Sequence, residues 1–223
     1  MQRIAAAAAG TRSAGAAQTT LAAAWGTDVD ATDLLRRALV LCADHELNAA
    51  TFAVRVAAST GASLPACLLA GLATLSGPLH GGATDRLRAM MGEPGLRGDP
   101  ARAVAARLAR GEDLPGFGHR LYPQGDPRAA ALFADLAPGR TWRRLLCAVE
   151  DQTGRRPNID AALVMLEDAL HLPVGAAMAV IVAGRSAGWI AHALDQRRNG
   201  SLIRLRAVYG GPIRETVYPA AAA

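Results

Sequence analysis

The chain has 223 residues, of which 51% are hydrophobic and 4% aromatic, and its formal net charge is +5. All 24 basic residues are arginines, which excludes Schiff-base lysine chemistry and the lysine of a phosphate-binding P-loop. The arginines are scattered without an aromatic-rich motif, so nucleic acid is not an expected partner. We see no apolar run long enough for a membrane span, so no membrane partner is expected either.

Residues 1–26 are rich in alanine, serine and threonine and lack acidic residues. This composition weakly resembles an organellar transit peptide, but a loose helix or low-complexity leader over residues 1–30 is favoured. The three cysteines, Cys42, Cys67 and Cys147, lie far apart in apolar surroundings without metal-ligand spacing. They are expected to be buried free thiols of a cytoplasmic protein, and they do not indicate a metal site.

Helical periodicity dominates the rest of the chain, so the fold class is expected to be all-α. Asp30 followed by Asp33 is typical of an N-cap with an acidic first turn. Only Leu202–Tyr209 alternates weakly like a strand. The expected helices span 31–58 with a break near His45–Asn48, then 64–75, 83–91, 100–111, 127–136, 141–153, 159–170 and 175–197.

Three segments rich in glycine and proline, 92–99, 111–126 and 137–140, are the expected linkers. They bracket short amphipathic helices that suit a small mobile domain. The longer apolar helices on either side are expected to form a larger domain.

The loop Gly116-Phe117-Gly118-His119 is followed by Asp126-Pro127-Arg128. Asp126 suits an N-cap and Pro127 the first helical position, which places Arg128 in the first turn. A histidine, an arginine and a helix N-terminus together predict a site for a substrate carboxylate.

Two further histidines stand in polar or glycine-rich surroundings. In Asp44-His45-Glu46-Leu47-Asn48, His45 and Asn48 would share a helix face, although a helix-terminating surface turn is the alternative. His80 lies between Gly77-Pro78 and Gly81-Gly82, just before a helix. A neutral histidine there can donate a hydrogen bond to a carbonyl that becomes enolate-like.

Asp160 follows Pro157-Asn158 in the first turn of its helix. It suits either a general base or an acidic residue that stabilises the helix by interacting with the helix dipole. Arg185 lies in a long apolar helix, where it needs a partner such as Asp160 or a substrate carboxylate. His192 follows seven residues later and is interpreted as a structural hydrogen-bonding histidine.

Taken together and in order, these motifs resemble the C-terminal half of the citrate synthase family. The resemblance covers residues 30–215 and rests on six segments: 44–48, 77–83, 115–128, 157–160, 184–192 and 204–211. It implies an N-terminally shortened two-domain helical fold with an active-site cleft. The implied domains are a large one of 31–83 with 171–223 and a small mobile one of 84–170.

The resemblance also implies an acyltransferase that condenses acetyl-CoA, as a substrate, with oxaloacetate, and that needs no metal or redox cofactor. Asp160 would take a methyl proton from acetyl-CoA, His80 would stabilise the enol, and His119 would polarise the ketone of oxaloacetate. The residues implied to hold the oxaloacetate carboxylates are His45, Arg128, Arg185 and, from a neighbouring subunit of a homodimer, Arg204. The loop implied to contact CoA is Leu114, Pro115, Gly116, Phe117 and Gly118.

The chain departs from the family pattern at Thr84, where asparagine is usual, and at Pro123, where a basic residue resembles a CoA-phosphate ligand. Its Arg204-Leu205-Arg206 replaces an Arg-Pro-Arg signature. The shortened chain leaves open a separately encoded N-terminal half. There are two alternatives: a non-catalytic paralogue that binds a di- or tricarboxylate, or a citryl-CoA lyase-type enzyme. The sequence does not decide whether the acyl donor is acetyl-CoA or propionyl-CoA.

Overall fold

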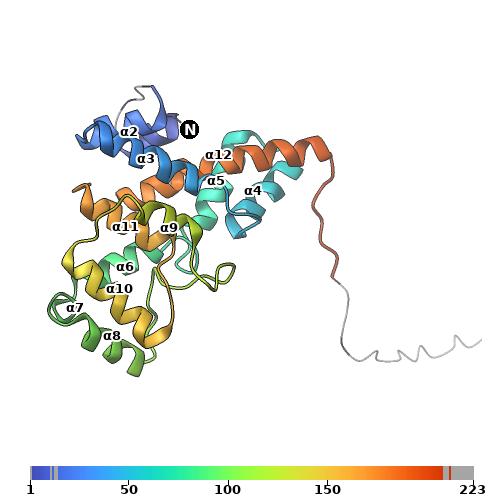
Figure 1. Ribbon diagram of the computed structural model, residues 1–223. Helices are drawn as coiled ribbons and strands as arrows, with labels where there is room; N and C mark the ends of the chain where they lie inside the picture. The colour runs from blue at the N-terminus through green and yellow to red at the C-terminus, as the bar shows by residue number, and fades with distance from the viewer. Residues whose placement is uncertain (1, 11, 13–14, 208–210, 212–223) are drawn as a thin grey trace, which may run out of the picture.

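The computed structural model describes residues 2–10, 12, 15–207 and 211, and within them it is all-helical, with no sheet (Figure 1). The helices in chain order are α1 Gln2–Ala8, α2 Ala17–Trp25, α3 Val29–Cys42, α4 Ala49–Ser59, α5 Leu64–Leu75, α6 Ala83–Gly92, α7 Pro94–Gly98, α8 Pro100–Ala109, α9 Pro127–Phe133, α10 Arg140–Thr153, α11 Ile159–Ala169 and α12 Ala176–Asn199. The all-α prediction is therefore confirmed.

Capping residues explain why most helices begin and end where the sequence predicts. The Asn158 side chain accepts hydrogen bonds from two backbone amides at the start of α11, and Asp126 caps α9 in the same way. Gly154 ends α10 in the left-handed conformation, with φ of 67°. At α3 the prediction is wrong by two residues, because Asp28 is the N-cap and Asp30 lies in the first turn.

The N-terminal segment is more ordered than its composition suggests. Helices α1 and α2 contact each other, and they also contact α12 and α3 respectively. Ala5 and Leu21 are fully buried. Small alanine side chains let these helices approach closely, so the expected low-complexity leader is largely helical and packed.

Three other expectations are corrected. The expected linker 92–99 contains the short helix α7. The expected strand does not form between residues 202 and 207, and residues 208 and 209 lie outside the described part. Cys42 and Cys67 are buried free thiols as predicted, but Cys147 is exposed on α10.

Two apolar cores meet along α12. The larger core joins α1–α3 and α6–α11 to the first half of α12, up to Ala183. The smaller core joins α4 and α5 to Trp189 and Ala193 in the second half. The larger core contains residues from both of the predicted domains, whose boundaries were placed at residues 84 and 170. The division into a large and a small mobile domain therefore stays a prediction.

Helix α12 is long and apolar enough to cross a membrane by length and composition, which the sequence analysis did not anticipate. Its contacts are those of a core helix, because Ala183, Trp189 and Ala193 are buried against other helices.

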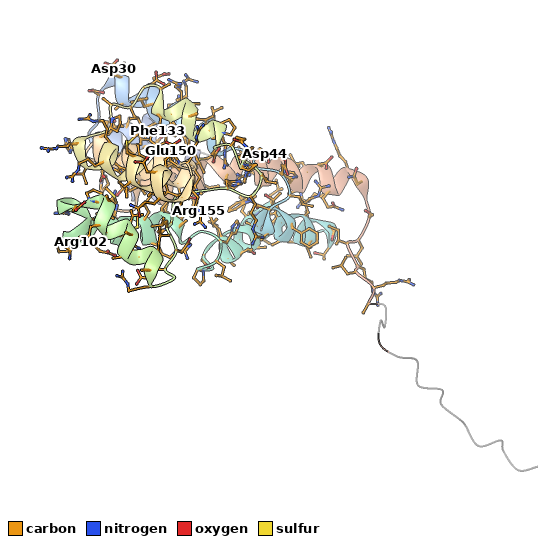
Figure 2. All side chains as sticks on the ribbon, turned by 60° about the horizontal axis from the view of Figure 1, so that its bottom comes forward. Asp30, Asp44, Arg102, Phe133, Glu150 and Arg155 are labelled. Carbon is orange, nitrogen blue, oxygen red and sulfur yellow. The ribbon has the colours of Figure 1, made fainter. Side chains whose placement is uncertain are left out.

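Two glycines on α12 let the end of α3 lie directly on it. A Cβ atom at Gly184 would lie 2.7 Å from the Leu39 carbonyl oxygen, and one at Gly188 would lie 2.1 Å from that of Ala43. Such separations are shorter than any van der Waals contact, so only glycine fits. The contact fixes the turn after α3, residues 43–48, against the middle of α12, and Figure 2 shows Asp44 beside that helix.

Replacing Gly188 with alanine is expected to lower the free energy of unfolding by roughly 1–3 kcal/mol, since the new methyl group must push α3 away. Urea denaturation measures this change. The matched control is Gly92→Ala at the end of α6, where a Cβ atom would meet nothing within 4 Å. Equal stability of Gly188→Ala and the wild type would contradict the close approach.

Candidate active site

A cavity of about 250 Å3 lies where the two cores meet. Side chains from both cores and from three turns form its wall. The lining residues are Cys42, His45, Asn48, Ala50, Leu75, His80, Gly81, His119, Arg128, Ile159, Asp160, Ile181, Arg185 and Trp189.

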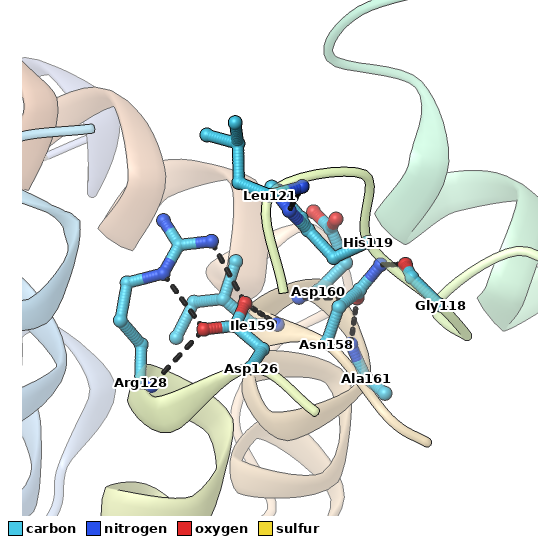
Figure 3. A network of polar contacts seen from close by, with 9 residues as sticks. All are labelled: Gly118, His119, Leu121, Asp126, Arg128, Asn158, Ile159, Asp160 and Ala161. Carbon is cyan, nitrogen blue, oxygen red and sulfur yellow. Dashed lines mark hydrogen bonds and ion pairs between the residues drawn. The ribbon is translucent and has the colours of Figure 1, made fainter. Parts of the chain in front are cut away.

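One buried carboxylate organises the side of the cavity formed by α9 and α11 (Figure 3). Asp126 accepts hydrogen bonds from Arg128 Nε at 3.0 Å and Nη2 at 2.7 Å, and from the Ile159 amide at 3.0 Å. Burial raises the pKa of Asp126, but these hydrogen bonds and the Arg128 charge outweigh burial and lower it. Arg128 is thereby held in one orientation at the cavity wall.

Asp160 lies in the first turn of α11, beyond the Asn158 cap. Burial raises the pKa of Asp160 to about 6, although the Arg128 charge partly offsets that effect. A carboxylate with this pKa is more basic than an ordinary aspartate and is still mostly ionised at pH 7, which suits a general base.

His119 has a defined tautomer. Its Nδ1 atom accepts a hydrogen bond from the Leu121 amide at 3.1 Å, so a neutral ring carries its proton on Nε2. Burial and the Arg128 charge lower the pKa of His119, which keeps the ring neutral at pH 7. His119 is therefore a hydrogen-bond donor through Nε2.

His45 lies in the turn after α3 rather than on a helix, and Asn48 caps α4. The ring of His45 meets that of His119 edge-on, with centroids 4.9 Å apart. Burial, together with the charge of Arg128, lowers the pKa of His45 to about 4. The prediction that His45 and Asn48 share a helix face is therefore wrong, and the turn alternative is right, although His45 is partly buried and lines the cavity.

His80 lies in the turn between α5 and α6. This turn needs Gly81, because a Cβ atom there would lie 2.1 Å from the Leu75 carbonyl oxygen. Burial lowers the pKa of His80, and the Arg185 charge adds to the effect. Burial and this charge both favour the neutral imidazole that the sequence predicts for His80.

Several donors around the cavity have no hydrogen-bond partner among the described residues. Arg185 is one of them, and its nearest carboxylate oxygen is Oδ1 of Asp44, 3.6 Å from Nη1. Asp44, not Asp160, is therefore its partner within the chain. Buried atoms left without a partner at the cavity wall are His45 Nε2, His80 Nε2, Arg185 Nη1 and Trp189 Nε1. Buried unpaired donors beside fixed guanidinium groups fit an anionic ligand rich in acceptors.

Six of the site residues predicted from sequence line this one cavity: His45, His80, His119, Arg128, Asp160 and Arg185. The other predicted residues do not. Arg204 is exposed on the segment that leaves the end of α12 and runs away from the helices (Figure 1). In the expected CoA loop, Leu114–Phe117 are buried and only Gly118 is partly exposed, so the side chains of Leu114 and Phe117 pack in the core.

Sequence reasoning missed several wall residues and one partner. Three of these wall residues lie on helices whose apolar sequence indicated only a place in the core: Cys42 on α3, and Ile181 and Trp189 on α12. The ion pair between Asp126 and Arg128 was missed as well, because Asp126 was assigned only a capping role. The signal available for that pair was the spacing Asp-Pro-Arg, which places both side chains at one helix start.

The fold and cavity define a class of protein: an all-helical protein whose cavity is lined by two arginines, three histidines and an aspartate. The comparisons with known proteins identify the family. The family model described as "Citrate synthase, C-terminal domain" matches residues 3–206. The chain belongs to the citrate synthase family.

Individual relatives agree with this assignment. The chain is 40% identical over 185 residues to "Putative citrate synthase 2" of Mycobacterium tuberculosis, which covers 78% of this chain and 50% of that protein. The citrate synthase of Thermoplasma acidophilum, solved in ternary complex with carboxymethyl coenzyme A and oxaloacetate, aligns with a TM-score of 0.77 and 27% identity over 98% of this chain and 66% of that one. The chain thus spans about half the length of the curated relatives it matches.

Some solved structures, at 22% to 23% identity, are similar in fold alone. The citryl-CoA lyase of Hydrogenobacter thermophilus has a TM-score of 0.75 at 22% identity, covering 89% of this chain and 85% of that one.

The raised pKa of Asp160 predicts a pH-dependent stability. The carboxyl group of an unfolded aspartate loses its proton near the ordinary pKa of 3.8, whereas folded Asp160 loses it near pH 6. The free energy of unfolding therefore falls as the pH rises from about 4 to 6. In Asp160→Asn the side chain does not ionise, so this pH-dependent fall is absent. Relative to wild type, the variant is expected to gain up to about 3 kcal/mol between pH 4 and pH 7.

Urea denaturation at a series of pH values measures this difference. The matched control is Asp85→Asn, an exposed carboxylate in the first turn of α6. A stability difference between Asp160→Asn and the wild type that stays constant from pH 4 to pH 7 would show that Asp160 is not desolvated.

Proposed function

We propose that this chain is a citrate synthase-like acyltransferase that condenses acetyl-CoA with oxaloacetate to give citrate and CoA. One observation carries the proposal: Asp160, His80 and His119 line a single cavity together with Arg128 and Arg185. These residues supply a base, two neutral donors and two cations. Their arrangement suits a substrate with two carboxylates and a ketone.

Oxaloacetate is proposed to bind through its carboxylates to Arg128, Arg185 and His45. Arg128 keeps its Nη1 atom free of hydrogen bonds to described residues while Asp126 fixes the rest of the guanidinium group. Arg185 Nη1 and His45 Nε2 are buried without partners. Arginine pairs with carboxylates through two parallel hydrogen bonds, which favours a dicarboxylate.

The proposed reaction begins when Asp160 removes a proton from the methyl group of acetyl-CoA. His80 donates a hydrogen bond to the thioester oxygen and stabilises the enol, as a neutral donor in a buried site can. The enol carbon then forms a bond to the ketone carbon of oxaloacetate, whose oxygen takes a proton from His119 Nε2. Water then attacks the thioester carbon of citryl-CoA, and CoA leaves as the thiol. The proton set free restores His119, and Asp160 gives up its proton to solvent, which leaves citrate, CoA and the starting enzyme.

The acetyl-CoA half of the site is proposed to lie along the loop 114–118, with Gly118 as its accessible part. The Arg155 and Arg156 side chains lie against this loop and its continuation. A Cβ atom at Gly118 would be 3.4 Å from Cδ of Arg155, and one at Gly125 would be 3.1 Å from Cδ of Arg156. These arginines are candidates for the phosphate contact that Pro123 cannot make.

Assembly and location belong to the same proposal. We infer a homodimer in which Arg204 of one subunit completes the oxaloacetate site of the other, since Arg204 is exposed and outside the cavity of its own subunit. The proposed location is the cytoplasm.

Two alternative activities keep the same site. A non-catalytic paralogue would bind the dicarboxylate without turnover, and a citryl-CoA lyase would run the carbon–carbon bond cleavage. The complete set of Asp160, His80 and His119 in one cavity favours an enzyme over the binding-only paralogue.

The activity is tested by adding acetyl-CoA and oxaloacetate to the purified chain and following free CoA with a thiol reagent. The wild type is expected to release CoA, and Asp160→Asn is expected to lower kcat by about 100- to 10,000-fold because the general base is lost. Asp85→Asn is expected to keep wild-type activity.

Absence of CoA release, with oxaloacetate still raising the melting temperature, would contradict condensation and favour the binding-only paralogue. Cleavage of citryl-CoA without condensation would instead favour the lyase.

The dimer proposal predicts complementation between two impaired variants. Asp160→Asn and Arg204→Ala are each expected to be nearly inactive. Mixed dimers would contain one site without either change, so random subunit exchange is expected to restore about a quarter of the wild-type activity. No recovery after refolding the two variants together, with dimers present by sedimentation, would show that Arg204 does not act across subunits.

A further inference from the structure

A second polar cluster lies outside the cavity wall, further along α12 towards its C-terminal end. It fills a shallow groove lined by Asp44, Arg55, His192 and Asp195, among others. Arg55 comes from α4, Asp44 from the turn after α3, and the other two from α12. Three separate elements are therefore tied together at this point.

The hydrogen bonds of this cluster define the state of His192. Arg55 Nη1 lies 3.2 Å from His192 Nδ1, and His192 Nε2 lies 3.2 Å from Oδ1 of Asp44. A guanidinium group is only a donor, so Nδ1 must accept and the ring must be neutral. The proton therefore resides on Nε2, which donates to Asp44.

Asp44 connects this cluster to the cavity, because the same oxygen, Oδ1, lies 3.6 Å from Arg185 Nη1. That distance allows charge attraction but exceeds a hydrogen bond. Asp44 thus offsets the charge of Arg185 while leaving the Nη1 hydrogens available to a ligand.

The side chain of Asp44 is 63% exposed, and by itself it would rotate freely into water. The donor at His192 Nε2 opposes that rotation. Arg55 in turn is held by Asp195 Oδ2 at 2.9 Å and by Gln196 Oε1 at 3.1 Å. The result is a continuous chain of contacts from α4 through α12 to the cavity arginine.

The far end of this chain reaches the segment that carries Arg204. Gln196 Nε2 donates a hydrogen bond to the Ser201 carbonyl oxygen at 3.0 Å, just beyond the end of α12. The same set of contacts therefore anchors the base of that segment.

We propose that His192 is a positioning residue for the dicarboxylate site: with Arg55 it fixes Asp44, and Asp44 holds Arg185 ready for a substrate carboxylate. This inference rests on the proposed function only in naming oxaloacetate as the ligand. His192 itself lines the outer groove and is not among the residues that line the cavity. Its effect is on substrate affinity rather than on the chemical step.

Calorimetric titration with oxaloacetate tests the proposal on the full chain. His192→Leu is expected to weaken oxaloacetate binding about tenfold, because a displaced guanidinium group loses its alignment with the ligand. His192→Gln, whose amide can still donate to Asp44, is expected to recover most of the affinity. In the CoA-release assay, KM for oxaloacetate should rise by a similar factor while kcat and KM for acetyl-CoA stay within about twofold of the wild type.

The control for a general loss of stability is Val54→Ala. Val54 is fully buried in the same α4–α12 core, but none of the contacts described for Asp44 involves it. This variant should melt earlier yet bind oxaloacetate like the wild type. If His192→Leu does not fold, Asp44→Asn provides the second variant, since it removes the counter-charge and retains an oxygen that accepts from His192.

Wild-type affinity in both His192→Leu and Asp44→Asn would overturn the proposal, as would equal weakening in Val54→Ala. A wild-type chain that binds oxaloacetate but releases no CoA would refute the proposed enzyme and leave the positioning test intact. A wild-type chain that does not bind oxaloacetate would overturn both.

Discussion

The carboxylate of Asp126 is the interaction on which the site depends most. It caps α9, receives two hydrogen bonds from Arg128 and one from the Ile159 amide, and so joins the starts of two helices. Arg128 and Asp160 are thereby fixed at one wall of the cavity. Because the carboxylate is buried, losing any one partner would leave a desolvated charge, and the arrangement is correspondingly rigid.

Helix α12 supplies the opposite wall and resolves an apparent conflict in the sequence. An arginine in the middle of an apolar helix is costly when it is buried alone. Part of that cost is offset for Arg185, because it lies where one core ends and the other begins, beside the cavity and near the Asp44 carboxylate. Gly184 and Gly188 make this possible, since they bring the turn that carries Asp44 and His45 onto the helix.

Local signals determined what the sequence could predict. Capping residues such as Asn158 and Asp126 act on the adjacent turn of the chain, so the starts of α11 and α9 could be predicted from the local sequence. The assembly of six site residues in one cavity followed from family resemblance rather than from periodicity. Long-range contacts were not predictable: the pairing of Arg185 with Asp44 joins residues far apart in the chain, and the burial of Leu114 depends on how several helices pack.

The central claim is that the unpaired donors at this cavity recognise a keto-dicarboxylate. A crystal structure of the chain grown with oxaloacetate tests it most directly. The account predicts one carboxylate on Arg128, the other on Arg185, and the ketone oxygen within hydrogen-bond distance of His119 Nε2. Oxaloacetate bound elsewhere on the protein, or a cavity that holds only water at saturating oxaloacetate, would contradict it.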